Sequence, residues 1–217
     1  MRHSIEEFYN YIKGKTVAIV CPAEYMVGLG KGKEIDLQDI VVRVKYIPDN
    51  VVDYGGRNDV FYHHFNTKRV DVLKLLRQYK RAKPEWVIHK LERRIKNTLP
   101  NIDYFKWACV EEVGHVPLRE ATGRQVNTGV LAIYTILQAE PKEVRLYGMD
   151  FYRSGYGKTK NRIDISIKKA KKAHKKHHNA DSQIMFMKRL VEEYDNFIID
   201  DTLRQVLDEW QCKSEGG

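Results

Sequence analysis

Residues 127–150 read NTGVLAIYTILQAEPKEVRLYGMD. A strongly apolar segment of helical length begins at Thr128, and Asn127 and Thr128 are residue types that cap helix N-termini. After a short polar turn comes Glu143–Tyr147, which has the length and composition of a strand and is followed by Gly148. An apolar helix that leads directly into a short strand is a repeating unit of α/β proteins.

The same alternation continues in both directions along the chain. Short apolar segments predict further strands at residues 15–21, 39–46, 58–62, 85–88, 106–111 and 197–199. Amphipathic segments predict helices at 69–81, 181–194 and 202–210, and a basic helix ending near Asn97. Strands that alternate with helices predict a single Rossmann-like, doubly wound α/β sheet. Such sheets bind ligands at the carboxyl ends of their strands.

The composition fits one globular domain. The 217 residues are enough for one α/β domain, so we expect a single domain over 1–217. No stretch reaches the length of a membrane-spanning helix, and the polar N-terminus is not a secretory signal. Three scattered cysteines provide no disulfide framework and no metal knuckle. We therefore expect a cytoplasmic protein, or a soluble one from which a targeting segment has been removed.

The positive charge is concentrated in one segment. Residues 158–177 contain nine Lys or Arg and one Asp, and so carry eight of the nine net positive charges. A basic footprint over the whole surface, typical of nucleic-acid binding, is therefore not expected. No aromatic residue lies between Gly157 and His178 to stack on bases, so we expect no nucleic-acid partner. We expect residues 157–177 to form a mobile basic lid.

Two segments could meet an anion. The strand at 15–21 leads into a turn with Gly28, Gly30 and Gly32, whose backbone N–H groups could approach a phosphate. The pattern GxGxxG is not met, and taken alone the glycines favour a flexible surface loop. The helix start at 127–129 offers unsatisfied N–H groups, and its alternative is a plain helix cap.

Two further segments carry hydroxyl and imidazole groups. Tyr152 and Tyr156 follow a strand and could donate hydrogen bonds to a departing phosphate, or pack as ordinary loop aromatics. His174, His177 and His178 could accept a proton near neutral pH. The alternative for these histidines is a solvated basic segment without a role in proton transfer.

Taken in order, these segments resemble the sialyltransferases. GLGKGKEIDLQDIVVRVKY (28–46) is similar to the large sialyl motif, and DYGGRNDV (53–60) to the segment that follows it. NTGVLAIYTILQAEPKEVRLYGMDFY (127–152) resembles the small motif, and HNADSQ (178–183) the very small motif. Within the third stretch, GMDFY is close to a segment of the bacterial lipooligosaccharide sialyltransferases.

The resemblance implies a variant GT-A fold and an inverting, metal-independent transfer from a CMP-activated sugar to a glycan acceptor, with no cofactor. The sugar would be sialic acid or a related ulosonic acid such as Kdo. His178 would be the general base, and Tyr152 and Tyr156 would hold the CMP phosphate. The donor-binding residues implied are Pro22, Ala23, Lys45, Asn127, Thr128, Gly129, Asp150, Tyr152 and Tyr156.

The sequence departs from the family pattern at several places. Pro22 and Ala23 stand where the family has a G-N-(S/G) turn, and proline provides no N–H group. Lys45 takes the place of a second asparagine, and Gln183 that of a glutamate. These changes leave a second interpretation open, which is a non-catalytic protein that binds a CMP-sugar or a glycan.

Overall fold

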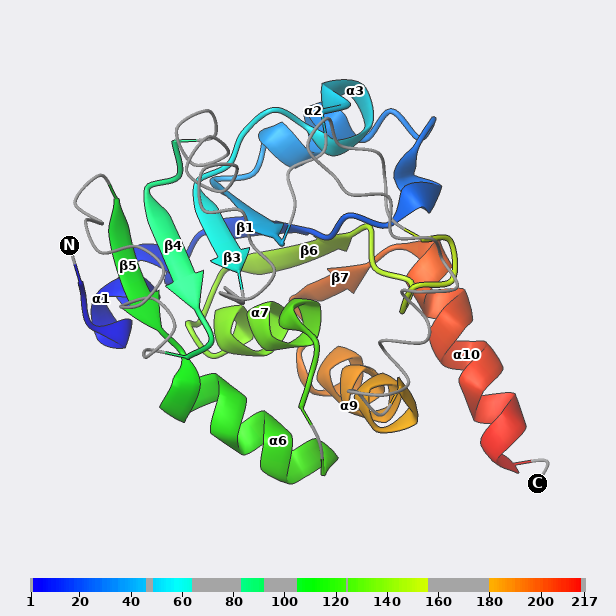
Figure 1. Cartoon of the computed structure of the whole chain (residues 1–217). Coiled ribbons are helices and arrows are strands. Elements are labelled where there is room, and N and C mark those ends of the chain that lie inside the picture. Colours follow the sequence, from blue (N-terminus) through cyan, green and yellow to red (C-terminus); the bar gives the residue numbers. More distant parts are fainter. Residues whose placement is uncertain are drawn as a thin grey trace, which may run out of the picture.

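The computed structural model describes residues 2–45, 49–63, 83–91, 105–123, 125–155 and 180–215. Seven strands form one sheet, and every pairing between neighbours is parallel (Figure 1). The strands are β1 (Thr16–Val20), β2 (Ile40–Val44), β3 (Val60–His63), β4 (Trp86–His89), β5 (Lys106–Cys109), β6 (Glu143–Tyr147) and β7 (Phe197–Ile199).

The strand order places the first strand near the middle of the sheet. The order is β5-β4-β3-β2-β1-β6-β7, so the chain builds outward from β1 to β5 and then returns to add β6 and β7 on the other side. The direction of winding therefore reverses between β1 and β6. This arrangement confirms the predicted doubly wound α/β fold and fixes where its ligand crevice is expected.

Helices cover both faces of the sheet (Figure 1). One face packs against α1 (Ile5–Ile12), α6 (Val116–Thr122), α7 (Thr128–Leu137), α9 (Ala180–Glu193) and α10 (Asp201–Glu215). The other face packs against the 3₁₀ helix η1 (Glu24–Met26), α2 (Gly32–Asp36) and α3 (Val51–Tyr54). Along β1, Val17 and Ile19 face the first layer and Ala18 and Val20 the second. Burial on both faces explains why the strands read as unbroken apolar runs.

Helix α1 was not predicted, although the sequence contains its signal. Ser4 and Glu7 form a capping box: the Ser4 hydroxyl accepts the Glu7 N–H at 3.2 Å, and the Glu7 carboxylate accepts the Ser4 N–H at 2.8 Å. Phe8 and Ile12 are buried on the following turns. The π-helix η2 (Glu111–His115), which runs into α6, was also not predicted.

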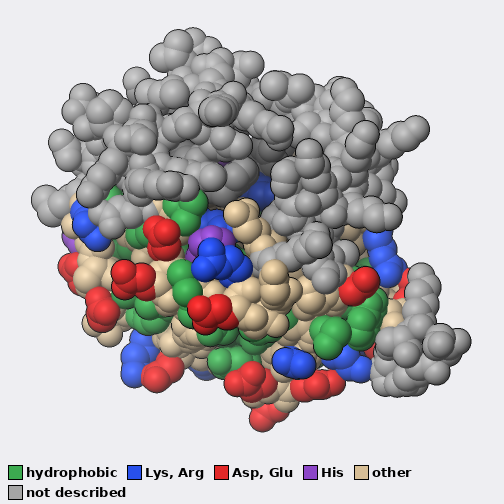
Figure 2. Space-filling view, turned by 60° about the horizontal axis from the view of Figure 1, so that its bottom comes forward, with side chains coloured by type: hydrophobic (Ala, Val, Ile, Leu, Met, Phe, Trp, Pro, Cys, Tyr) green, Lys and Arg blue, Asp and Glu red, His purple; other side chains and the backbone are tan. Residues whose placement is uncertain are grey.

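All seven predicted strands form, β6 and β7 with the predicted bounds. The predicted helices at 69–81 and near Asn97 lie outside the described residues, as does the basic segment 157–177. Where the structure describes the chain, no helix is long and apolar enough to cross a membrane. Figure 2 shows acidic and basic side chains interspersed on the described part of one face.

The glycine-rich turn serves the fold. The backbone N–H groups of Gly28 and Gly30 both donate to the Asp53 carboxylate, each at 2.8 Å. A Cβ on Gly32 would lie 2.0 Å from the Val51 carbonyl oxygen, so only glycine lets α2 pack this closely on α3. The turn is therefore neither a phosphate cradle at these two amides nor a loose surface loop.

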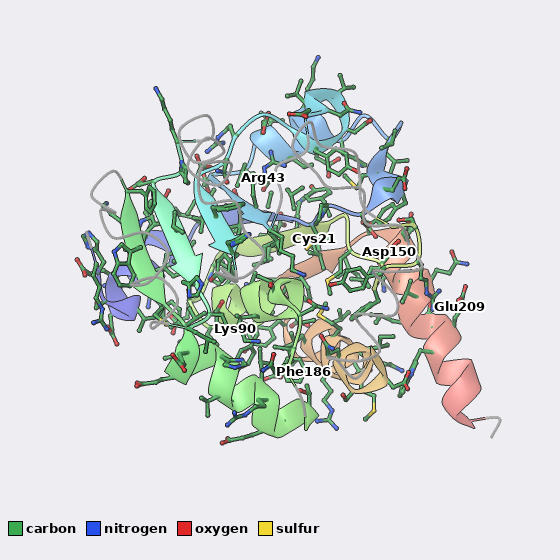
Figure 3. All side chains as sticks on the ribbon, viewed as in Figure 1. Cys21, Arg43, Lys90, Asp150, Phe186 and Glu209 are labelled. Atoms are coloured by element: carbon green, nitrogen blue, oxygen red, sulfur yellow. The ribbon has the colours of Figure 1, made fainter. Side chains whose placement is uncertain are left out.

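A buried arginine connects the first two motif segments. The Arg43 Nε donates to the Arg57 carbonyl at 2.8 Å, and its Nη1 donates to the Tyr54 carbonyl. Asp36 lies 4.0 Å from the same guanidinium group and accepts the Arg57 N–H at 3.0 Å. Figure 3 shows Arg43 on the side of the sheet that α2 and α3 cover. The motif residues in 28–60 thus bind one another.

Candidate functional site

A pocket opens at the reversal point of the sheet. It lies at the carboxyl ends of β1, β2 and β6, beside the N-terminus of α7. Figure 3 shows Cys21 and Asp150 at this end of the strands. The lining residues are Cys21, Pro22, Ala23, Val44, Lys45, Asn127, Gly129, Gly148, Met149, Asp150, Phe151, Tyr152 and Gly155. This is the position at which doubly wound sheets bind their ligands.

The wall that follows β1, residues 21–23, has few groups that could donate a hydrogen bond to an anion. The Cys21 N–H donates to the Tyr147 carbonyl at 2.8 Å, and the Ala23 N–H donates to the Gly148 carbonyl at 3.0 Å. Pro22 between them has no N–H group. Burial raises the pKa of the Cys21 thiol to about 12, so the sulfur is neutral at physiological pH. Any anion in the pocket must therefore be held from the other walls.

A cation stands at the end of β2. Lys45 adopts a left-handed backbone conformation, with φ at 64°. Its Nζ donates to the Tyr152 hydroxyl at 3.3 Å and lies 5.8 Å from the centre of that ring. An ammonium group and a phenol that converge in a pocket are suitable donors for a phosphate or a carboxylate.

The loop after β6 carries Tyr152 on an unusual backbone. Phe151 and Tyr152 have φ of 52° and 68°, and the glycines at both ends, Gly148 and Gly155, have φ of 72° and 95°. Consecutive left-handed residues with side chains are uncommon, and such strain concentrates at functional sites. Asp150 is buried and supports the loop, because its carboxylate accepts the Ser154 N–H at 2.6 Å.

The fourth wall is the start of α7. The Asn127 side chain caps the helix by accepting the Val130 N–H at 2.9 Å. The Asn127 N–H in turn donates to the Gln183 side chain of α9 at 2.9 Å. Gly129 faces the pocket, and a Cβ there would lie 3.3 Å from the Cys21 sulfur. A side chain at this position would therefore press against the β1 wall.

The structure brings together most of the residues that the sequence singled out. Seven of them line the pocket: Pro22, Ala23, Lys45, Asn127, Gly129, Asp150 and Tyr152. Thr128 is buried beside it but does not line it. Tyr156 and His178 lie outside the described residues, together with His174 and His177.

Sequence reasoning missed six of the lining residues, namely Cys21, Val44, Gly148, Met149, Phe151 and Gly155. Each stands at the end of a strand or in the loop after β6, close to a residue that was named. The signal that could have found them is the position at the carboxyl end of a parallel strand.

Two buried histidines extend the same edge of the sheet. His63 ends β3 and is paired in register with His89, which ends β4. Burial lowers the pKa of His63 to about 3, and the positive charge of Lys45 acts in the same direction. His63 is therefore neutral at physiological pH. Within the described ranges, no group of three or more His, Cys, Asp or Glu could hold a metal ion.

The strand order and the pocket define a doubly wound α/β protein whose ligand site is expected at the switch point. The structure is similar to a variant of the sialyltransferase CST-II in complex with CMP. The TM-score is 0.59 at 16% identity, over 85% of this chain and 80% of that chain. It is also similar to a mammalian sialyltransferase, with a TM-score of 0.57 at 12% identity over 86% and 69% of the two chains.

A third similar structure is CstII from Campylobacter jejuni in complex with the substrate analogue CMP-3FNeuAc. Its TM-score is 0.53 at 16% identity, over 85% of this chain and 81% of that chain. No family profile and no curated protein matches the sequence. At these identities the likeness establishes the fold, which is the GT-A-like fold that the resemblance to the sialyltransferases implied.

Proposed function

We propose that this chain is a CMP-sugar-dependent glycosyltransferase of the sialyltransferase type. It transfers sialic acid, or a related ulosonic acid such as Kdo, to a hydroxyl group of a glycan acceptor. The observation that carries the proposal is the pocket itself. Residues from four separate segments, singled out because they stand at the donor-binding positions that the sialyltransferase resemblance implies, line one pocket at the switch point of the sheet.

The proposed chemistry is a single displacement with inversion and without a metal ion. The acceptor oxygen attacks the anomeric carbon, and the bond from that carbon to the CMP phosphate oxygen breaks. The hydroxyl proton moves to His178, and the electron pair leaves with CMP. Lys45 and Tyr152 hold the departing phosphate, with Tyr156 as a third donor. Because CMP has a single phosphate, these donors take the part that a divalent cation plays for diphosphate sugars.

Two observations favour a second function, a non-catalytic protein that binds a CMP-sugar or a glycan. The β1 wall has lost the side-chain donor that the motif places there, and its backbone N–H groups are bonded within the fold. Gln183, where the motif has an acid, cannot take up a proton as a carboxylate does, and it accepts the Asn127 N–H. These two departures from the motifs favour the second function.

The test is a thermal-shift screen against CMP, CDP, UDP, GDP and ADP, with EDTA or with a divalent ion. We expect CMP and CDP to stabilise the protein and EDTA to change nothing. A ligand at 100 times its Kd stabilises by roughly 2.7 kcal/mol, which such a screen resolves. Stabilisation by UDP with manganese in preference to CMP would overturn the proposal. Binding of CMP without turnover of CMP-sialic acid or CMP-Kdo would select the second function.

A further inference from the structure

The short helix η1 is attached to the loop that follows β6. The Glu24 N–H donates to the Gly155 carbonyl at 3.2 Å, and the Tyr25 N–H donates to the Ser154 hydroxyl at 3.2 Å. These bonds fix the far end of the loop, which begins at Gly148 and carries Tyr152. The loop is therefore held from outside as well as by its own turn.

The Tyr25 hydroxyl holds the near end of the loop. It accepts the N–H groups of Gly148 at 3.0 Å and Met149 at 3.2 Å, and it donates to the Asp200 carboxylate. The other oxygen of Asp200 accepts the Leu203 N–H at 2.9 Å at the start of α10. One phenol thus joins the segments that follow β1, β6 and β7.

This contact has a cost in stability. Burial raises the pKa of Asp200, and the negative charge of Asp201 raises it further. The hydrogen bonds from Tyr25 and Leu203 lower this pKa, but by less than burial raises it. Burial and the neighbouring Asp200 also raise the pKa of Tyr25. A partly buried carboxylate loses part of its hydration, which costs free energy. The presence of Asp200 is better explained by the position in which it holds the Tyr25 hydroxyl.

The peptide held by Tyr25 has little room to move. Gly148 has φ of 72°, and a Cβ there would lie 2.1 Å from the Cys21 carbonyl oxygen. Four residues later the same loop brings the Tyr152 hydroxyl to the Lys45 ammonium group at 3.3 Å. A rotation of the Gly148–Met149 peptide would carry the Tyr152 side chain away from Lys45.

We propose that Tyr25, oriented by Asp200, is a positioning residue that sets the Gly148–Met149 peptide and so places the Tyr152 hydroxyl beside Lys45 to receive the phosphate of the donor. The inference rests on the proposed function for the identity of the ligand. Tyr25 of η1 and Asp200 after β7 would then contribute to phosphate recognition although neither contacts the ligand.

The experiment compares Tyr25→Phe with Glu209→Gln. Tyr25→Phe keeps the ring and removes only the hydroxyl. Glu209→Gln breaks an ion pair on the same loop, Arg153 Nη1 to Glu209 Oε2 at 2.6 Å, whose partners are both partly exposed. Binding of CMP and of cytidine is measured by calorimetry. Exchange of the loop amide protons at 148–155 is measured without ligand.

We expect Tyr25→Phe to bind CMP roughly tenfold more weakly, with cytidine affinity unchanged and faster exchange at Gly148 and Met149. Glu209→Gln should match the wild type in all three measurements. Equal losses for CMP and cytidine, or unchanged exchange, would overturn the inference. If the wild type binds no cytidine nucleotide but the exchange result holds, the proposed function fails and the positioning of the loop stands.

A second variant covers the case in which Tyr25→Phe does not fold. Asp200→Asn keeps a side-chain oxygen that can accept a hydrogen bond from the Tyr25 hydroxyl. The variant should therefore retain most of the preference for CMP over cytidine. If Asp200→Asn folds and loses CMP and cytidine affinity alike, the inference is wrong. If both variants fail to fold, the contact is structural and the inference is likewise wrong.

Discussion

Lys45 combines a left-handed backbone conformation with a positively charged side chain. Its φ of 64° lies in the left-handed region, which asparagine and glycine tolerate better than lysine. The sialyl motif has an asparagine at this place. Lysine keeps the left-handed conformation at a cost of about 1 kcal/mol and adds a positive charge. Because the β1 wall has few groups that could bind an anion, Lys45 is the residue that we propose receives the phosphate of the donor.

The proposed general base is a single side chain and can be tested as one. His178→Ala should lose on the order of a hundredfold to ten-thousandfold in transfer rate, because general acid–base catalysis contributes that much. CMP affinity should remain, since the base contacts the acceptor. The measurement is sugar transfer at saturating donor, alongside CMP binding by calorimetry.

His174→Ala and His177→Ala are the matched controls, because both lie in the same basic segment. We expect mild effects from both. Wild-type transfer by His178→Ala, or an inactive His174→Ala, would show that the base has been assigned to the wrong histidine.

Among the elements, the contact between α2 and α3 depends on one missing side chain. A Cβ on Gly32 would lie 2.0 Å from the Val51 carbonyl and 2.6 Å from the Val52 carbonyl, and neither backbone group can move without shifting α3. We expect Gly32→Ala to lower the free energy of unfolding by roughly 2–3 kcal/mol, as overpacking does. Urea denaturation measures it.

The control for this change is Lys33→Ala, an exposed neighbour on the same helix. It should stay within about 0.5 kcal/mol of the wild type. Equal stability of the two variants would mean that α2 moves freely on α3 and that the glycine is not required.

The elements that the sequence predicted are those with a strong local pattern. Strands buried on both faces and the apolar helix α7 show it in composition alone. Helix α1 spans only eight residues, and η2 has no period that separates it from a turn, so neither was predicted. In the site, positions at strand ends were predictable. The contact of Tyr25 with Asp200 was not, because it spans 175 residues and leaves no local pattern.

For the whole molecule, one buried histidine makes stability depend on pH. The unfolded chain protonates His63 near pH 6.5, whereas the folded protein does so only at about pH 3. Between these values the unfolded state binds more protons, so stability falls as the pH is lowered from about 6.5 to 3. The loss is roughly 5 kcal/mol at most.

His63→Leu tests this dependence. The variant has no imidazole to protonate, so its unfolding free energy relative to the wild type should rise as the pH falls. Urea denaturation of both proteins at pH 7, 5.5 and 4 measures the difference. Parallel curves for the two proteins would show that His63 is not the group responsible.

The central position of β1 has a consequence for synthesis on the ribosome. Strand β1 pairs with β2 on one side and with β6 on the other, and β6 is translated only after β2 to β5. One long edge of the first strand therefore stays open while more than a hundred residues emerge, which takes on the order of ten seconds. The residues that line the pocket are complete once Gly155 has left the exit tunnel, but the contact of Tyr25 with Asp200 forms only later. Nascent chains truncated between these two residues therefore have the walls of the pocket without the contact that holds the loop after β6.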